Sequence, residues 1–258
     1  MTARPVITLL TDFGTQDPYV GMMKGVIATI CPEANVIDIT HEVPPQDVRI
    51  GAFFLERARS YFPKGTVHLA VVDPGVGTSR GRIALGAGGQ FFVGPDNGLL
   101  CLAARRYRGV ALTRRSFFLP SVSNTFHGRD LFAPVAAHLA RGAPLERLGP
   151  VRRHIVQIPW PKPRRTKLGV VAEIISVDRF GNLITNLELS HWRSIRSPRL
   201  SAGGFTSTTL STSYEGVRKR QIVLVFGGYG LLEIAAPSGS AAKVLGLGLG
   251  DPVRLTGG

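Results

Sequence analysis

The chain has 258 residues, of which 44% are hydrophobic, and its 31 basic and 17 acidic side chains give a formal net charge of +14. This hydrophobic content excludes an intrinsically disordered protein, and the length suits one large domain or two moderate ones. The two cysteines, Cys31 and Cys101, lack the spacing of a zinc site and lie beside apolar runs, as expected for core residues in a reducing compartment. Asp12 ends the first apolar run too early for a signal peptide, and no segment has membrane-spanning length, so we expect a cytoplasmic protein.

The first half of the chain alternates strand-like and helix-like segments. Short apolar runs typical of buried strands occupy residues 6–10, 36–40 and 66–72. Between them, residues 19–30 have helical length and end before Pro32, and residues 47–61 have an apolar face with Asp47 as the expected N-cap. Strand–helix–strand units of this spacing predict right-handed crossovers and a mainly parallel sheet, and therefore an α/β domain.

Polar side chains follow these strands. Asp12, His41 and Asp73 each stand where a predicted strand ends. Because the carboxyl ends of parallel strands meet at one edge of a sheet, we expect the three to share a crevice there. A proline and two glycines follow Asp73 and let backbone amides approach a ligand, and Arg80 returns a positive charge toward Asp73. A strand-ending turn with a surface ion pair is the simpler alternative for this stretch.

The rest of the first half predicts a mixture of elements. We expect a hairpin between residues 82–85 and 90–93, a turn at 94–98, and helices at 99–106 and 131–139. His127 lies in the loop before the last of these helices, where an amide-rich helix N-terminus favours anions. A single histidine at such a place is commonly a structural hydrogen-bond donor, so its position alone does not assign it a role.

A proline-rich basic segment, residues 159–165, is the expected linker between an N-terminal α/β domain (1–158) and a C-terminal domain (166–258). After it, short apolar runs separated by glycine, serine and asparagine predict strands at residues 170–177, 183–187, 221–226, 231–235 and 253–255. This pattern predicts a small antiparallel β-barrel. We expect the Ser/Thr/Gly-rich residues 203–213 to form a loop or hairpin tip.

An ordered set of motifs in both halves resembles the S-adenosyl-L-methionine hydroxide adenosyltransferases, adenosine-forming hydrolases related to fluorinase and chlorinase. The motifs are TDFG (11–14) followed by Asp17 and YVGMMKG (19–25), IDITH (37–41), YFPKGTVH (61–68), VDPGVGT (72–78), PDNG (95–98), TFHGRD (125–130) and FGNLITN (180–186). The resemblance runs from about residue 6 to 255. It implies a seven-stranded N-terminal α/β domain, a C-terminal β-barrel, and a homotrimer whose active sites lie between subunits.

The implied activity is hydrolysis of S-adenosyl-L-methionine to adenosine and L-methionine. In these hydrolases an Asp, an Arg and a His surround a water molecule, and by position they correspond to Asp73, Arg80 and His127. Asp73 and His127 can orient that water and accept its proton, while Arg80 can stabilise the developing hydroxide that attacks C5′. The resemblance implies no metal and no cofactor, since S-adenosylmethionine is the substrate.

The same resemblance assigns substrate contacts by position. Asp12 corresponds to the residue that binds the ribose hydroxyls, Asp17 to one that holds the methionine amino group, and Phe180 and Asn182 to adenine contacts. Taken without the resemblance, these residues are also typical of a strand cap, a helix N-terminal acid and a turn.

One stretch departs from the family pattern. The family usually has Asn-Ser-x-Gly before its Leu-Glu-Ile-Ala segment, whereas GGYG occupies residues 227–230 here. The side-chain contacts made at that place are therefore missing. Backbone groups of Gly228 and Tyr229 replace them, or the substrate is bound more weakly.

Two alternatives remain from the sequence. A halogenase of the same superfamily would use chloride or fluoride, but those enzymes lack the Asp and His that are present here at positions 73 and 127. A nucleic-acid-binding protein on this scaffold would use the basic surface, whose densest groups are Arg105–Arg106, Arg114–Arg115, Arg152–Arg153, Arg164–Arg165 and residues 218–220. No aromatic-interleaved basic motif accompanies them, so we expect a solvated basic surface and no nucleic-acid partner.

Overall fold

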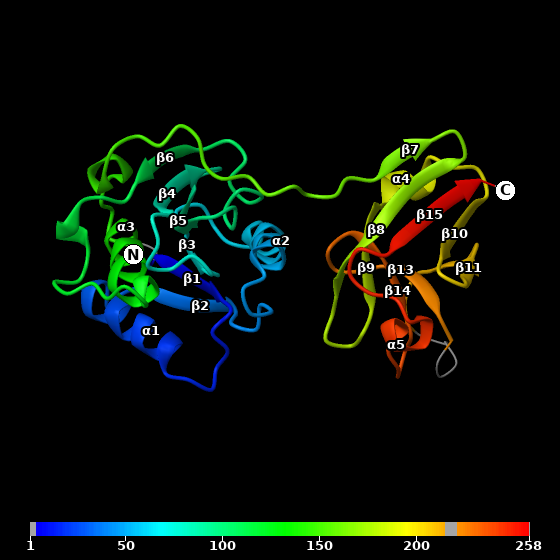
Figure 1. The fold of residues 1–258 in the computed structure, drawn as a ribbon, viewed down its shortest axis with the longest axis horizontal. Helices are drawn as coiled ribbons and strands as arrows, with labels where there is room; N and C mark the ends of the chain where they lie inside the picture. Colours follow the sequence, from blue (N-terminus) through cyan, green and yellow to red (C-terminus); the bar gives the residue numbers. More distant parts are fainter. Residues whose placement is uncertain (1–3, 215–220, 258) are drawn as a thin grey trace. The chain divides into compact units, whose positions relative to one another are not determined.

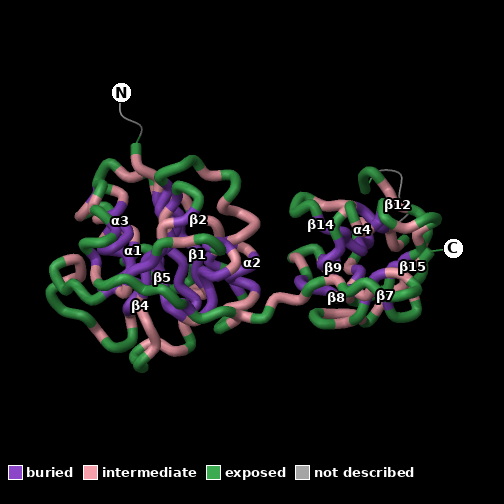
Figure 2. The backbone as a smooth tube through the Cα atoms, turned by 90° about the horizontal axis from the view of Figure 1, so that it is seen from above, coloured by how far each residue is buried: buried purple, intermediate pink, exposed green. Residues whose placement is uncertain are grey.

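The structure of the chain is a computed structural model that describes residues 4–214 and 221–257. The chain divides into two compact units, Met1–Ile158 and Pro159–Gly258 (Figure 1), which we call the N-terminal and C-terminal domains. Each has its own buried interior (Figure 2). The predicted mixed α/β architecture with a separate β-rich C-terminal part is confirmed.

A six-stranded sheet forms the centre of the N-terminal domain. Its strands are β1 (Val6–Thr11), β2 (Asn35–Thr40), β3 (Val67–Val71), β4 (Gly81–Ala87), β5 (Gln90–Asp96) and β6 (Arg108–Ala111), in the order β2-β1-β3-β5-β4-β6. Neighbours from β2 to β5 pair in parallel, whereas β4 is antiparallel to both β5 and β6. The expected mainly parallel sheet and its hairpin are therefore both present.

Helices cover both faces of this sheet. The helices are α1 (Tyr19–Ile30), α2 (Val48–Arg59) and α3 (Ala133–Ala140), with short helical turns η1 (Arg115–Phe117), η2 (Gly128–Phe132) and η3 (Leu145–Leu148). Successive strand residues point to opposite faces, so Leu9 packs into the core formed with α1 and α3 while Leu10 packs into the core formed with α2. Asp47 caps α2 as predicted, because its carboxylate accepts a hydrogen bond of 2.9 Å from the Ile50 amide.

Three details of the N-terminal domain differ from the sequence-based expectations. Residues 99–106 form turns and bends just before β6 instead of a helix. The apolar part of this run is buried on the α2 side of the sheet, whereas Arg105 and Arg106 are exposed. The expected turn at 94–98 begins later, since β5 continues to Asp96. The described sheet has six strands, where the family resemblance implied seven, and Val151 meets Val110 of β6 only as an isolated bridge.

A curved, mainly antiparallel sheet makes up most of the C-terminal domain. Its strands are β7 (Arg164–Thr166), β8 (Gly169–Val177), β9 (Leu183–Glu188), β10 (Pro198–Ala202), β11 (Phe205–Ser207), β12 (Leu210–Ser211), β13 (Val223–Phe226), β14 (Leu231–Ala235) and β15 (Pro252–Gly257), with helices α4 (Leu189–Arg193) and α5 (Ala241–Leu245). The order is β11-β10-β15-β8-β9-β14-β13-β12, and β7 pairs with β8. The sheet curls around one apolar core, so it resembles part of a barrel more than a closed one.

The segment expected to be a loop or hairpin tip, residues 203–213, includes a hairpin turn and two short strands. β10 and β11 form a hairpin in which Ala202 pairs with Phe205 across Gly203 and Gly204. β12 pairs in parallel with β13, which is the one exception to the antiparallel pattern among the described strands. The sequence did not predict these strands, because they lie at the edge of the sheet, bury few side chains and are rich in Ser and Thr.

Both cysteines are free and buried in the N-terminal domain, as expected for small core residues. In the described part of the chain, no helix combines the length and the apolar character needed to cross a lipid bilayer.

Candidate active site

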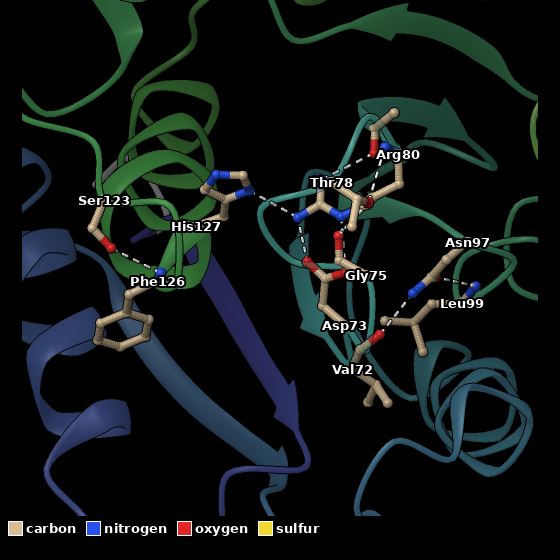
Figure 3. Close-up of polar contacts among 11 residues, drawn as sticks. Val72, Asp73, Gly75, Thr78, Arg80, Asn97, Leu99, Ser123, Phe126 and His127 are labelled. Carbon is tan, nitrogen blue, oxygen red and sulfur yellow. Dashed lines mark hydrogen bonds and ion pairs between the residues drawn. The ribbon is translucent and has the colours of Figure 1, made fainter.

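Asp73 lies just beyond the carboxyl end of β3 (Figure 3). Thr11 of β1 pairs with Val71 of β3, so Asp12 and Asp73 follow the ends of adjacent parallel strands at one edge of the sheet. Tight turns follow Asp73, and the Thr78 hydroxyl donates a 2.7 Å hydrogen bond to the Gly75 carbonyl. These turns reverse the chain and bring Arg80 back to Asp73, as the sequence predicted.

The contact between Arg80 and Asp73 is bidentate. Arg80 Nε donates to Asp73 Oδ1 at 2.8 Å, and Arg80 Nη2 donates to Asp73 Oδ2. The two side chains are only 9% and 5% exposed, so this is a buried ion pair and not the surface pair of the simpler sequence-based alternative. Arg80 also donates to the Gly81 carbonyl at 3.1 Å and lies 5.3 Å from the centre of the Phe132 ring. The guanidinium is therefore held on several sides in one orientation.

Arg80 also joins Asp73 to His127. Its Nη2 lies 2.9 Å from His127 Nδ1, although the two residues are 47 positions apart in the chain. A guanidinium can only donate, so Nδ1 must accept and the ring proton of the neutral imidazole is on Nε2. Burial lowers the pKa of His127, and the charges of Arg80 and Arg82 lower it further against the opposing effect of Asp73 and Asp130. The histidine is therefore neutral at pH 7.

A π-helical turn, η2, sets the position of His127. His127 immediately precedes Gly128–Phe132, and α3 follows without a break, so the expected helix begins later than residue 131. Asp130 is fully buried and accepts hydrogen bonds from the Ser123 amide and from Arg129, which tie the loop before His127 to the turn after it. Single π-turns of this kind are frequent at functional sites.

Asn97 is a part of this edge to which the sequence reasoning gave no role. It follows β5, and its Nδ2 donates to the Val72 carbonyl at 2.8 Å while its Oδ1 accepts from the Leu99 amide at 3.1 Å. Asn97 therefore fixes the residue directly before Asp73. The PDNG motif could have predicted this role of Asn97, because it ends the neighbouring strand and polar residues at such strand ends share the edge with Asp73.

Asp12 is held by the chain that follows β2. Its Oδ2 accepts a 2.8 Å hydrogen bond from the Gln46 amide. The preceding Thr11 hydroxyl lies 2.8 Å from Nδ1 of the buried His41, whose Nε2 lies 3.1 Å from Asp38. His41 therefore supports the loop that carries Asp12, and its place at the shared edge agrees with the sequence-based expectation.

Aromatic side chains lie beside the same edge. Phe13, Tyr19 and Phe126 pack edge-to-face with ring centroids 5.2 to 6.0 Å apart, and Tyr19 is 45% exposed. Asp17, in the loop before α1, is exposed. The edge thus combines carboxylates with an accessible aromatic surface, which suits a ligand with both polar and planar parts.

Phe180 and Asn182 lie in a separate pocket of the C-terminal domain. This pocket has a volume of about 660 Å³ and is lined by Asp178, Phe180, Asn182, Tyr214, Gly228, Glu233 and residues 236–239. Phe180 is 75% exposed and presents its ring, whereas Asn182 is buried. Asp178 accepts hydrogen bonds from the Phe180 and Asn182 amides and from Asn182 Nδ2, which fixes the turn that carries both residues.

Tyr229 follows Gly228 in the segment that departs from the family pattern. Burial and the charges of Asp178 and Glu233 raise its pKa. Gly228 lines the pocket, so the departure from the family pattern falls directly on its wall. Across residues 4–214 and 221–257, no cluster of three or more His, Cys, Asp or Glu side chains is placed to hold a metal ion.

The protein therefore has two domains, one with the Asp73–Arg80–His127 network at a sheet edge and one with a pocket beside an exposed aromatic ring. Residues 7–149 match the family described as the SAM hydroxide adenosyltransferase N-terminal domain, and residues 172–254 match the corresponding C-terminal domain. The chain belongs to this family.

Individual relatives agree with that assignment. The chain is 43% identical to the (R)-S-adenosyl-L-methionine hydrolase of Salinispora tropica, with all of both chains covered, and 42% identical to that of Thermus thermophilus over 98% of this chain and 99% of the relative. A fluorinase of an Actinoplanes species is more distant, at 30% identity over 71% of this chain and 72% of its own. An uncharacterised conserved protein from Thermotoga maritima has a similar structure, with a TM-score of 0.90, 38% identity, and 97% and 99% of the chains covered.

Proposed function

We propose that this protein hydrolyses S-adenosyl-L-methionine to adenosine and L-methionine, using Asp73, Arg80 and His127 to present the attacking water. The observation that carries the proposal is the buried, hydrogen-bonded chain from Asp73 through Arg80 to His127. The hydrolase names of relatives at 42 and 43% identity support the substrate. The fluorinase relative is more distant and covers less of the chain, so halogen transfer is the weaker candidate.

The reaction needs a well-placed nucleophile more than an activated leaving group. As water oxygen bonds to C5′, the C5′–S bond breaks and its electron pair neutralises the sulfonium, which releases methionine as a neutral thioether. Asp73 accepts the water proton and passes it to solvent, because its carboxylate oxygens retain lone pairs beyond those used by Arg80. Arg80 stabilises the negative charge that develops on oxygen, and the Nε2–H of His127 orients it.

Substrate contacts are distributed over both domains. Asp12 accepts hydrogen bonds from the ribose diol, and Asp17 pairs with the methionine ammonium group. Phe180 stacks on the adenine ring, and Asn182 contacts its polar edge. Tyr229 and the backbone of Gly228 contribute contacts in place of the family's Asn-Ser pair. Support for these roles comes from the family motifs and from the position of each residue at the sheet edge or at the C-terminal pocket.

The complete site forms in a homotrimer, where the catalytic residues of one subunit meet the C-terminal pocket of its neighbour. This proposal follows the assembly implied by the family resemblance, and residues 159–165 serve as the linker between domains. Light scattering coupled to gel filtration checks it. A fully active monomer at micromolar concentration would contradict the shared site.

The reaction requires no cofactor besides its substrate, and we place it in the cytoplasm, where S-adenosylmethionine is made and used. Purified protein is incubated separately with the (R) and the (S) sulfonium forms of the substrate, and the products are separated by chromatography. Each form that is hydrolysed should give adenosine and methionine in equimolar amounts. In ¹⁸O-labelled water, the label should appear on C5′ of adenosine. Unlabelled adenosine, or 5′-chloroadenosine as the main product in chloride, would contradict hydrolysis.

A further inference from the structure

Glu233 is a buried acid in the C-terminal pocket. It lies on β14, between Leu232 and Ile234, whose side chains belong to the apolar core. Because side chains alternate along a strand, Glu233 points to the opposite face, where it lines the pocket and is only 6% exposed. A carboxylate at such a depth requires hydrogen-bond donors, since burial removes the water that would otherwise supply them.

One donor is present within the domain. Tyr214 Oη donates to Glu233 Oε2 at 2.9 Å, and burial together with this contact raises the pKa of Tyr214 to about 12, so the phenol keeps its proton. Among residues 4–214 and 221–257, Glu233 Oε1 accepts no hydrogen bond. Half of the carboxylate is therefore free to accept from a ligand.

The other acid of the pocket has less spare capacity to accept hydrogen bonds. Asp178 already accepts three hydrogen bonds, from the Phe180 amide, the Asn182 amide and Asn182 Nδ2. These bonds also occupy an Asn182 donor, which leaves the Asn182 carbonyl oxygen as a second acceptor. The pocket thus has spare acceptors beside an exposed aromatic ring, and a matching ligand is planar and carries N–H donors.

Gly227 makes the position of Glu233 possible. A Cβ atom at residue 227 would lie 1.6 Å from Glu233 Oε1, so any side chain there would displace the carboxylate. This glycine belongs to the GGYG segment, in which the family usually has asparagine at this place. In this chain, Gly227 leaves the space that the Glu233 carboxylate occupies.

We propose that Glu233 is a specificity-determining residue that accepts a hydrogen bond from the exocyclic 6-amino group of the purine and so selects adenine over purines without this group. The inference rests on the proposed function, because it places the adenosyl part of the substrate in this pocket. A site built to bond an N–H group discriminates strongly against an analogue that lacks it, since the buried acceptor is then left unpaired.

Binding of three nucleosides to the full-length protein tests this role. Calorimetry should show adenosine binding roughly 10- to 100-fold more tightly than purine riboside, which lacks the amino group, or inosine, which has a carbonyl oxygen there. In Glu233→Gln, the amide can donate to that carbonyl oxygen, so adenosine should bind about 10-fold more weakly and inosine a few-fold more tightly. Loss of fold alone would weaken both ligands together.

Two further variants show whether a lost preference for adenosine is caused by the Glu233 carboxylate or by general damage to the pocket. Gly227→Ala should reduce the preference for adenosine in the same way, because it displaces Glu233 without changing its chemistry. Glu188→Gln, at an exposed position at the end of β9, should keep the wild-type preference. Equal binding of adenosine and purine riboside by the wild type, or an unchanged preference in Glu233→Gln, would overturn the proposal.

The same preparations are assayed for hydrolysis of S-adenosylmethionine. Absent hydrolysis with the adenosine preference intact contradicts the proposed function alone. Normal hydrolysis without a preference contradicts the role of Glu233 alone.

Discussion

The two candidate parts of the site are built in opposite ways. In the N-terminal domain, Asp73 and Arg80 are nearly inaccessible, and their polar atoms are paired with each other, with His127 and with the backbone. In the C-terminal pocket, Phe180 is 75% exposed, and one Glu233 oxygen accepts no hydrogen bond from any residue that the structure describes. The first arrangement is preorganised before any ligand arrives, whereas the second is completed only by a ligand.

This difference matches the two tasks that we propose. Stabilising charge on an attacking water is most effective when donors and acceptors are fixed in advance, so that nothing reorganises during the reaction. Recognition of a base instead needs unpaired groups and an open ring surface, because these create the difference in affinity between ligands. Variants of the Asp73–Arg80–His127 network should therefore change mainly the rate, and variants of the C-terminal pocket should change mainly the affinity.

The largest expected effect is on the chemical step. Asp73→Ala and His127→Ala should each lower the single-turnover rate about 100- to 10,000-fold, while substrate affinity stays within a few-fold of wild type. Arg80→Lys should also be impaired, because an ammonium cannot bond Asp73 and His127 with the planar fork of a guanidinium. Arg147→Lys, at an exposed position in η3, is the matched control and should be unchanged. Near-normal turnover by folded Asp73→Ala and His127→Ala would contradict the triad.

Acid should destabilise the N-terminal domain through His68. Burial lowers its pKa to about 4, its Nδ1 lies 2.7 Å from the Thr8 hydroxyl, and its ring stacks on Phe92. Well above pH 6.5 neither the folded nor the unfolded histidine is protonated. As the pH falls from 6.5 to 4, only the unfolded chain takes up the proton, so about 3 kcal/mol of stability should be lost.

Urea denaturation at pH 7 and pH 4.5 measures this loss. His68→Gln, which retains a side-chain polar group for Thr8, should have a flatter dependence of stability on pH than the wild type. An equal loss in both proteins would show that other groups cause the acid sensitivity.

Asp12→Ala should act mainly on binding. Ribose contacts exist in both the ground and the transition state, so their loss should weaken the affinity for S-adenosylmethionine about 10- to 100-fold with little change in the single-turnover rate. Asp12→Asn keeps an acceptor for the Gln46 amide and should be intermediate. A fall in rate as large as that of Asp73→Ala would place Asp12 in the chemistry instead.

The smallest expected effect concerns the GGYG segment. A Cβ atom on Gly228 would meet nothing within 4 Å, so Gly228→Ser should fit, restore the family's usual residue and strengthen binding of S-adenosylmethionine a few-fold. Gly227→Asn should instead weaken it, because a side chain there collides with Glu233. Calorimetry on Gly228→Ser and Gly227→Asn measures whether the two substitutions change the affinity for S-adenosylmethionine in opposite directions. An equal change in affinity at both positions would contradict this prediction.

Local patterns predicted much of the fold. Apolar periodicity located β1, β2, β3, α1 and α2, and Asp47 was identified as a cap from its residue type alone. The location of Asp12, His41 and Asp73 at one edge of the sheet was predicted from the rule that the carboxyl ends of parallel strands meet at the same edge. Residues 99–106 were wrongly expected to be helical, because an apolar run records burial and does not distinguish a helix from packed turns.

The sequence by itself therefore determined the order of elements, the sheet edge and, through family motifs, the residue types proposed for the chemistry. Only the tertiary structure decided that Arg80 bonds both Asp73 and His127, that Asn97 fixes Val72, and that Glu233 accepts a hydrogen bond from Tyr214. These contacts join residues that are distant in the chain. Propensity and periodicity act over a few residues, whereas partners of buried polar groups are set by packing, which depends on the whole domain.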